Sequence, residues 1–595
     1  MKSEDLIRAI GLADDKYVLE AKKPAKIKKR RRIITSVAAA CITLILVNLW
    51  LFLPIQPPPY IAAFAGSEYY PIIERLYLNT EAKKYELPYN NNFEKLLYKA
   101  NQSTNMPSSG TDGTTDSYGG TTLGSPTDPN YIETTDNQNE GVIESDRIKR
   151  SDKYVYYVQN NQLMVYSLQG ESYTLEGAVW LKTYNTEIFL SLDCRYITAI
   201  SQFSKKTYIC VLDVSDPRNI EQVSEITIDS SYPEARYLGD RLVIAAQSNI
   251  DFSKKEYSDP STFVPRLEYN GKTKIISMDD IHITSYEYSE YKNYTTLYVL
   301  DPVTLEPKSS FALLGGSETI YFSEDNVFTV ANYDKDGTDY CEISCVSYTD
   351  GELEFRCAVE ALGHVENRRW MDELDGKLRV FADTNTVFNG KDNKSATLSI
   401  IDLKKKKVIS TVENFAPSEE TIQSVRFEKD KAYVCTAIVV ELTDPVFFFD
   451  LSDYKNISYT DTGTIPGYSL SLIDYKNGDL LGIGLGENRT FKLELYREEN
   501  TQVVSKSKLE YRSAILSEYK AYFIDRDRKL FGCELMLAKE NVYVLWEIKD
   551  GEIVEVFKEQ THIENYSPNT RALLTDGYLY IFSDRGVFVH QFENN

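Results

Sequence analysis

The stretch SVRFEKDKAYVCTAIVVELTDPVFFFDLSD, residues 424–453, decides the fold. Apolar and polar residues alternate in Val425-Arg426-Phe427, and the alternation returns in Ala432-Tyr433-Val434 after a short polar turn. A third apolar run, Phe447 to Phe449, ends in Asp450. Alternation with a period of two predicts half-buried strands, and short polar turns between such runs predict hairpins. The stretch therefore predicts consecutive antiparallel strands.

The same pattern recurs from about residue 142 to the C-terminus. Comparable hairpins begin near residues 148, 187, 236, 319, 368, 423, 468, 512 and 571. Repeats of about 40–50 residues with four strands each are typical of β-propeller blades, which stack around an axis because one blade cannot bury both faces alone. We expect the first and last hairpins to share one blade. The prediction is an all-β propeller of about eight four-stranded blades, with seven or nine as alternatives.

Several motifs in this region carry a family resemblance. In chain order they are Asn139-Glu140-Gly141-Val142, Asp146-Arg147-Ile148-Lys149, Asp213-Val214-Ser215-Asp216-Pro217, Asp375-Gly376-Lys377-Leu378-Arg379-Val380, Ser424-Val425-Arg426-Phe427, Thr443-Asp444-Pro445-Val446-Phe447, Asp450-Leu451-Ser452-Asp453, Ile465-Pro466-Gly467-Tyr468-Ser469 and Leu481-Gly482-Ile483-Gly484. They resemble the secreted bacterial and archaeal β-propeller family that is distantly related to tryptophan-aspartate repeats. The resemblance implies an exported propeller over about residues 139–592, without an established activity. The family usually shows Tyr-Leu-His-Pro after Tyr468-Ser469, whereas this chain has Leu470-Ser471-Leu472-Ile473, so a function of that histidine would be absent.

The N-terminal region predicts a membrane anchor. Residues 33–53 are uncharged and long enough to cross a ~30 Å hydrocarbon core as a helix. The basic cluster at residues 22–32 precedes them, and positive charge keeps that end cytoplasmic. We therefore expect a single-pass plasma-membrane protein with its N-terminus inside and the propeller outside. A signal peptide cleaved near Ala63-Phe64-Ala65 and a lipid on Cys41 are less favoured, because the apolar run is too long for a signal core and continues past the cysteine.

Composition divides the chain into five predicted regions. They are a cytoplasmic basic N-terminus (1–32), a transmembrane helix (33–53), a proline spacer with a short helical stalk (54–100), a disordered linker (101–139) and the extracytoplasmic propeller (140–595). The linker is rich in Ser, Thr, Gly, Asp and Asn and has too few apolar residues to fold. Residues 1–21 contain Ile10-Gly11, Asp14-Asp15-Lys16-Tyr17 and Glu20-Ala21. Through these residues they resemble a segment that precedes the membrane helix in many membrane proteins of clostridial-type bacteria, some of them regulatory.

The charge balance argues against nucleic acid as a partner. The formal net charge is −23, although residues 1–56 carry a net charge of +6, so the remainder is strongly acidic. Such a surface repels phosphates and anionic lipid. It is compatible with cationic ligands, or it serves only to keep the protein soluble. Eight cysteines in 595 residues are too sparse for a disulfide scaffold, so we expect buried free thiols.

No catalytic motif supports an enzyme. The four histidines (His282, His364, His562 and His590) are scattered, and the sequence lacks GxSxG, HExxH and phosphate-loop motifs. Paired carboxylates of a glycosidase or lyase could be assembled from 89 acidic residues, but that abundance makes a pair undiagnostic. We therefore do not expect an enzyme.

Two segments contain candidate site residues. Residues 250–292 interrupt the third repeat, and long loops in compact domains are often functional. Its candidate ligand-binding residues are Arg266, Tyr269, Asp279, Asp280 and His282. The alternative is an insertion that only covers a blade edge.

The second segment resembles half a calcium loop, with Asp334, Asp336 and Asp339 as candidate Ca²⁺ ligands. It lacks the third alternate ligand and the distal glutamate, so a polar hairpin turn without metal is the simpler interpretation. Otherwise we expect no cofactor.

These observations favour a monomeric membrane-anchored binding or scaffold module for an extracytoplasmic protein or cell-surface polysaccharide. The first alternative is a transmembrane sensor that couples the propeller to a cytoplasmic regulator. The second is a glycosidase- or lyase-type enzyme.

Overall fold

The computed structural model describes residues 68–76 and 131–592, with internal gaps. The gaps are 140–141, 184, 252, 254–255, 257, 284–292, 316–318, 389–390, 439–442, 463–464, 476–477, 500–501, 513–518, 538–539 and 563–568. The predicted regions 1–32 and 33–53, and most of the stalk and linker, lie outside the described residues. The chain divides into two compact units, Met1–Tyr70 and Pro71–Asn595, and every described strand belongs to the second.

The localisation expected from the sequence is corrected here. In the described part of the chain, no helix has the length and apolar character needed to cross a membrane. The short helix over 70–76 buries Ile72, Ile73 and Leu76, in agreement with the helical spacing of these residues, but it is only two turns long. The predicted span 33–53 lies outside the described residues, and the structure gives the single-pass plasma-membrane assignment no support.

The first part of the second unit contains three sheets. The first has the order β1 (Tyr131–Ile132), β3 (Ile148–Ser151), β4 (Val155–Gln159), β5 (Gln162–Gln169), β6 (Ser172–Trp180). The second has the order β14 (Lys272–Ile275), β13 (Arg266–Tyr269), β10 (Glu221–Ile228), β9 (Lys206–Asp213), β8 (Tyr196–Phe203), β7 (Thr186–Leu190). The third has the order β15 (Ile281–Ile283), β17 (Pro307–Leu314), β16 (Asn293–Leu300), β12 (Leu242–Asn249), β11 (Ser231–Tyr237), β2 (Ile143–Glu144).

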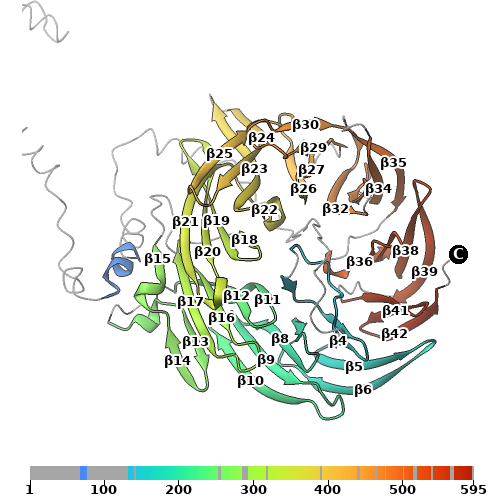
Figure 1. The fold of residues 1–595 in the computed structure, drawn as a ribbon, viewed down its shortest axis with the longest axis horizontal. Helices are drawn as coiled ribbons and strands as arrows, with labels where there is room; N and C mark the ends of the chain where they lie inside the picture. Colours follow the sequence, from blue (N-terminus) through green and yellow to red (C-terminus); the bar gives the residue numbers. More distant parts are fainter. Residues whose placement is uncertain are drawn as a thin grey trace, which may run out of the picture. The chain divides into compact units, whose positions relative to one another are not determined.

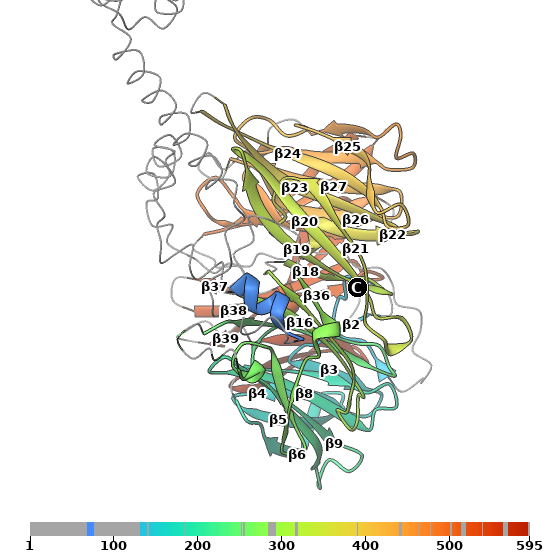
Figure 2. The ribbon, with the colours of Figure 1, turned by 90° about the vertical axis from the view of Figure 1, so that its left-hand side faces the viewer.

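An 8-stranded sheet follows, in which two four-stranded units are joined by the pairing of β20 with β23. Its members are β18 (Thr319–Phe322), β19 (Asn326–Lys335), β20 (Thr338–Ser347), β21 (Glu354–Leu362), β22 (Met371–Leu374), β23 (Lys377–Phe388), β24 (Lys391–Asp402) and β25 (Lys407–Val412). Figure 2 shows the long strands β20 and β23 running alongside each other.

The remaining strands form three 4-stranded sheets, a small two-stranded sheet and a final 3-stranded sheet. The four-stranded sheets are β26 (Thr421–Glu428), β27 (Lys431–Ala437), β29 (Val446–Asp450) and β30 (Ser458–Asp461); β32 (Tyr468–Asp474), β33 (Asp479–Leu485), β34 (Phe491–Glu499) and β35 (Gln502–Tyr511); and β36 (Phe523–Asp525), β37 (Leu530–Leu537), β38 (Glu540–Lys549) and β39 (Glu552–His562). The two-stranded sheet pairs β28 (Thr443–Asp444) with β31 (Ile465–Pro466), and the final sheet is β40 (Arg571–Thr575), β41 (Tyr578–Ser583) and β42 (Gly586–Gln591). Five short 3₁₀ turns among the described residues are η1 (Pro260–Thr262), η2 (Met278–Asp280), η3 (Thr349–Gly351), η4 (Arg368–Trp370) and η5 (Tyr519–Ala521).

The sheets follow one another in chain order around a common centre (Figure 1). This confirms the all-β architecture that the alternating runs predict. The expectation that the first and last hairpins share one blade was wrong for the described residues, because β3–β6 and β40–β42 belong to separate sheets. These two sheets meet by side-chain packing, in which Tyr157, Tyr166, Tyr580 and Phe582 form one buried cluster.

In several sheets an aspartate ends the third strand or follows it directly. Its carboxylate accepts a hydrogen bond from the turn that leads to the fourth strand. A backbone N–H two or three residues further on donates to each carboxylate, at 2.9 Å for Asp213, 3.1 Å for Asp301, 2.8 Å for Asp402 and 3.0 Å for Asp450. Such Asx turns satisfy donors that the sheet ladder leaves unpaired. The recurring aspartate is therefore explained by turn geometry.

Candidate functional site

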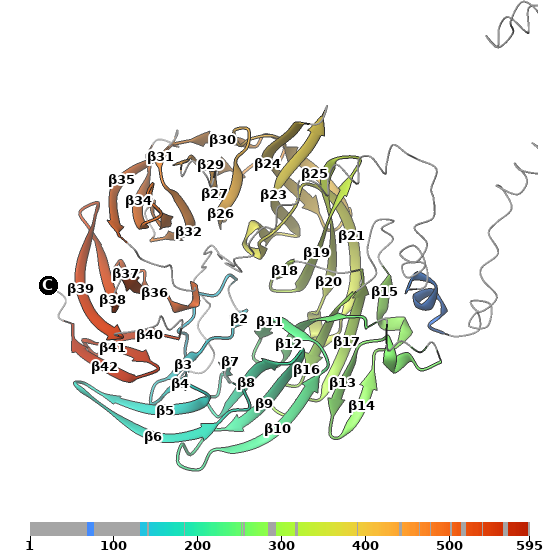
Figure 3. The same ribbon diagram turned by 180° about the vertical axis from the view of Figure 1, so that it is seen from behind.

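Buried ion pairs gather around Glu144 on the inner side of the ring. β2, in residues 142–146, lies on the inner side of the ring, where it pairs with β11 (Figure 3). Arg236 of β11 and Arg368 of η4 approach the Glu144 carboxylate to 3.4 Å and 2.9 Å, and the Tyr519 hydroxyl donates to it at 3.0 Å. Burial alone would raise the pKa of Glu144, but Arg236, Arg368 and Arg369 hold it well below its usual range.

Further charged pairs tie the same segment and its neighbours to other sheets. The buried Lys149 ammonium lies 3.1 Å from Glu133 and donates to the Thr135 hydroxyl at 2.8 Å. Asp146 accepts from Arg571 of β40 at 2.9 Å. Because these partners come from opposite ends of the chain, the central cluster joins the start of the ring to its end. The centre is thus a structural hub.

A hollow of about 300 Å³ opens at the rim, between the 250–292 segment and β16–β17. Its lining combines two cations with two carboxylates: Lys274, Lys308, Asp280 and Glu352. Its other lining residues are Leu267, Ile275, Ile276, Tyr298, Pro307, Ser309 and Ser310. The arrangement offers a ligand both signs of charge around an apolar base, with serine hydroxyls that can donate or accept hydrogen bonds.

The electrostatics of Asp280 reflect this crowding. Partial burial, then the charges of Asp279 and Glu352, raise the pKa of the Asp280 carboxyl. A carboxyl with a raised pKa beside a second carboxylate can act as a hydrogen-bond donor or as a proton donor.

Asp280 is the only one of the five predicted ligand-binding residues that lines this hollow. Arg266 is paired with Asp229 at 2.7 Å, and Tyr269 donates to the Thr304 carbonyl at 3.4 Å. The His282 ring stacks on Phe355 with centroids 3.8 Å apart, and burial lowers the pKa of His282. Asp279 lies exposed beside Asp280. The five residues therefore do not converge on one point.

The insertion also covers blade edges, which was the alternative interpretation. Strands β13 and β14 extend the second sheet beyond β10, and β15 pairs in parallel with β17 of the third sheet. The same segment thus closes two edges and forms the wall of the hollow between them.

The three aspartates of the predicted calcium site lie on the hairpin between β19 and β20. Asp336 and Gly337 form its two-residue turn with φ of 55° and 79°, and Gly337 N–H donates to Asp334 at 3.2 Å. Asp339 lies 3.4 Å from His364. Within the described residues no three His, Cys, Asp or Glu side chains gather in a way that could hold a metal. A tight polar hairpin accounts for these residues, and calcium stays a prediction.

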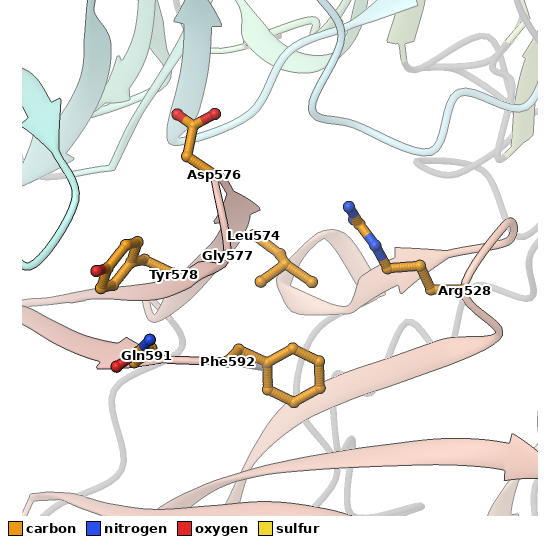
Figure 4. Close-up of a pocket in the computed structure, with 7 residues that line it drawn as sticks. All are labelled: Arg528, Leu574, Asp576, Gly577, Tyr578, Gln591 and Phe592. Carbon is orange, nitrogen blue, oxygen red and sulfur yellow. The ribbon is translucent and has the colours of Figure 1, made fainter. Parts of the chain in front are cut away.

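A second, larger hollow of about 520 Å³ lies where the β36–β37 turn faces the β40–β41 turn. Figure 4 shows Leu574 and Phe592 on its floor, with Arg528 on one side and Asp576 at its edge. Arg528 is already paired with Asp525 at 2.8 Å. At the hollow beside the 250–292 segment Lys308 is likewise paired, with Asp301 at 3.5 Å, but the lining there also holds Lys274, Asp280 and Glu352. The larger hollow therefore offers fewer charges to a ligand.

Sequence reasoning did not identify the central residues as a group. Glu144, Arg236, Arg368 and Tyr519 are far apart in the chain, and only their sheets bring them together. One signal was present: Arg236, Arg379 and Arg426 are arginines inside apolar strands, which is rare unless a buried partner exists.

The fold and its rim hollow define a propeller-type protein with an inserted segment, and comparison with known proteins identifies its family. The description of the matching family is "Beta propeller domain", and the match covers residues 132–595. The chain belongs to this family.

Two curated relatives are archaeal proteins of uncharacterised function. MJ1554 of Methanocaldococcus jannaschii is 32% identical over 225 residues, which cover 37% of this chain and 34% of the relative. A protein of Archaeoglobus fulgidus is 26% identical over 328 residues, which cover 54% of this chain and 46% of the relative. The chain thus spans less than half of the length of either relative.

Solved structures show only a loose likeness. The dihydro-heme d1 dehydrogenase NirN in complex with DHE has a TM-score of 0.35 at 8% identity, covering 73% of this chain and 78% of that chain. Apo AztD from Citrobacter koseri has a TM-score of 0.31 at 9% identity, covering 74% of this chain and 89% of that chain. These scores carry no argument about function.

Proposed function

We propose that the chain is a binding or scaffold module that recognises a protein or a polysaccharide at the hollow beside the 250–292 segment. The observation that supports this function is the lining of that hollow, where Lys274 and Lys308 stand with Asp280 and Glu352 over apolar side chains. Loops held on a rigid strand scaffold are common recognition surfaces. The sheets supply the rigidity, and the insertion supplies the specific wall.

The test is a comparison of ligand capture by three forms of the full chain. The wild type, the double variant Lys274→Glu/Lys308→Glu and the control Lys404→Glu are each immobilised and exposed to a polysaccharide panel and to proteins of the source cell. Lys404 is exposed on the turn before β25, away from the hollow. We expect the double variant to lose a ligand that the wild type and the control retain. Equal capture by all three forms would show that the hollow is not the site.

A second candidate function is carbohydrate cleavage by Asp280 and Glu352. The raised pKa of Asp280 beside a second carboxylate is the pattern of a general acid paired with a base or nucleophile. Asp280→Asn should abolish any hydrolysis of chromogenic glycosides, while Asp279→Asn should retain it. If the wild type hydrolyses no glycoside, the cleavage proposal is wrong and the binding function remains. The sensor alternative rests on residues 1–32, outside the described residues.

We also propose a nine-bladed ring. The described strands form eight units of four or more strands: the first three sheets with five, six and six, the two halves of the 8-stranded sheet, and the three 4-stranded sheets. The 3-stranded β40–β42 unit adds one more. This matches the upper alternative of the repeat count. Electron microscopy of the protein, with particle averages viewed down the ring axis, tests it by the number of radial densities.

A further inference from the structure

The last sheet has fewer strands than the other units. It has the order β40-β41-β42, so among the described strands β42 pairs only with β41. In the neighbouring units a fourth strand, β6 or β39, occupies the outer position. Figure 3 shows β42 at the rim between β39 and β6. The outer edge of β42 therefore presents backbone N–H and C=O groups that a further strand could pair with.

One wall of this edge is apolar and exposed. Tyr173, Leu175 and Trp180 of β6 are 40%, 48% and 73% exposed. A bulge at β6 keeps these three on one face, because they pair with Leu168, Tyr166 and Gln162 of β5. This face is the one turned to the last sheet, since Tyr166 and Leu168 pack with Tyr580 and Phe582.

The opposite wall has the same character. Val554 and Phe557 of β39 pair with Glu547 and Leu545 of β38, and Leu545 packs with Leu579 and Ile581 of the last sheet. Val554 is 38% exposed on this face. Of the ten exposed large hydrophobic side chains in the described residues, three lie on β6 and two on β39. The outer position beside β42, which no described strand occupies, thus lies between two partly exposed apolar faces, and we call this position the slot.

The position of the edge decides what can enter. Because β42 occupies the third position of its sheet, it is recessed between two neighbouring sheets that each have a fourth strand. A rigid second copy could not bring its own recessed β42 against this one, since the flanking strands of both copies would collide. A single extended segment needs only the spacing of one strand, about 4.8 Å, beside β42.

Charge specifies the segment further. Glu176 of β6 and Glu555 of β39 accept hydrogen bonds from the hydroxyls of Ser167 and Tyr511, on the faces turned away from the last sheet. Glu552 and Glu559 lie on the same face of β39 as Val554 and Phe557, because they pair with Lys549 and Tyr543 of β38. These carboxylates favour a basic segment, while the two apolar walls require apolar side chains on both of its faces.

We propose that the outer edge of β42 is a docking site for one extended segment of a partner polypeptide, which adds as the fourth strand of the last sheet. The segment pairs with residues 586–590 through its backbone. It places apolar side chains against Leu175 and Trp180 on one face and against Val554 and Phe557 on the other, and it has Lys or Arg at its ends. This mode of recognition takes affinity from backbone hydrogen bonds and specificity from the alternating side chains. It is separate from the hollow proposed above.

The experiment measures binding of labelled synthetic octapeptides to the full chain by fluorescence anisotropy. The first peptide has six Val, Ile or Phe residues between two terminal lysines. The second replaces one central residue by proline, which cannot complete the ladder. The third has terminal glutamates. We expect saturable binding of the first peptide, none of the second, and weaker binding of the third.

Protein variants locate the site. Leu175→Glu and Trp180→Glu should each weaken binding of the first peptide by about tenfold or more, through loss of one apolar wall. Phe203→Glu is the matched control, because Phe203 is 65% exposed at the β8–β9 hairpin, outside the slot. All three variants remove an exposed side chain, so circular dichroism should show an unchanged fold.

Three results would overturn the proposal. They are no binding of the lysine peptide to the full chain, equal binding by the wild type and both slot variants, and a self-association in sedimentation that Trp180→Glu abolishes. The last result would assign the slot to a second copy.

Discussion

At the scale of single residues, the structure depends on buried charges that have assigned partners. The Glu144 carboxylate pairs with Arg236 and Arg368 and accepts a hydrogen bond from Tyr519, each from a different sheet or turn. Removing one partner of a buried ion pair costs much more than the pair contributes, because the remaining charge stays desolvated. Two predictions follow from particular carboxylates.

Glu144→Gln should lower the free energy of unfolding by roughly 3–5 kcal/mol, because it leaves the central guanidinium groups without their carboxylate. The measurement is the urea midpoint of the full chain. Glu171→Gln is the control, since Glu171 is exposed on the β5–β6 turn, and it should change stability by about 0.5 kcal/mol at most. Equal midpoints for the two variants would contradict the structural role of Glu144.

The raised pKa of Glu428 predicts that the stability of the protein depends on pH. Burial raises the pKa of the Glu428 carboxyl to about 7. The charge of Arg426 opposes this rise, and the charge of Asp474 adds to it. A carboxyl whose folded pKa is raised contributes stability that is complete below its unfolded pKa and is lost as the pH rises through the folded value. Stability should therefore fall between about pH 4.5 and pH 7.5, from the ordinary pKa of a glutamate to just above its folded value. Glu428→Gln should flatten that slope, whatever the urea midpoint of the variant.

The measurement is the urea midpoint at several pH values. Glu171→Gln serves again as the control and should keep the slope of the wild type. A slope that Glu428→Gln leaves unchanged would assign the effect to other groups.

At the scale of elements, close approach of neighbouring strands explains the motif Leu481-Gly482-Ile483-Gly484. A Cβ at Gly484 would lie 1.9 Å from the Tyr468 carbonyl oxygen of β32, and one at Gly482 would lie 2.4 Å from the Ser469 hydroxyl. Neither position has a positive φ among the described backbone angles, so the glycines serve close packing. The motif is therefore a requirement of the β32–β33 pairing.

Gly484→Ala should destabilise the protein by about 1–3 kcal/mol or more, because the backbone of β32 must move to admit the methyl group. Gly271→Ala is an instructive contrast, since its Cβ would meet nothing within 4 Å and its φ of +68° is the only cost. That cost is about 1 kcal/mol. Thermal unfolding of both variants gives the comparison, and a Gly484→Ala variant as stable as Gly271→Ala would contradict the packing argument.

At the scale of the whole molecule, the ends of the chain meet through side chains and not through a shared sheet. Phe582 of β41 lies 5.5 Å and 5.8 Å, centroid to centroid, from Tyr157 and Tyr166 of the first sheet. The Tyr580 hydroxyl donates to the Gly170 carbonyl at 2.5 Å, and Asp146 pairs with Arg571. The contact between first and last sheet is therefore a defined place where the ring can open.

Phe582→Ala should cost about 3–5 kcal/mol and open this contact first. Hydrogen exchange should then show lost protection in β3–β6 and β40–β42 while β26–β30 remain protected. Phe449→Ala removes an equally buried ring from another cluster and should show the reverse pattern. Uniform loss of protection in both variants would mean that the ring opens only as a whole.

The sequence by itself determined the strands, the hairpins and the family, because these depend on local periodicity and on the residues that a tight turn requires. It also located the 250–292 interruption and Asp280 within it. It could not place Arg266 or His282, which contact Asp229, just after β10, and Phe355 of β21 instead of the hollow.

Only the tertiary structure decided which distant charges share the centre, which sheets remain separate and where an edge stays open. Glu144 and Arg368 are 224 positions apart, and Asp146 and Arg571 are 425 positions apart. A charge in an apolar strand signals a buried partner but does not name it, because the partner is chosen by how the sheets pack around the axis.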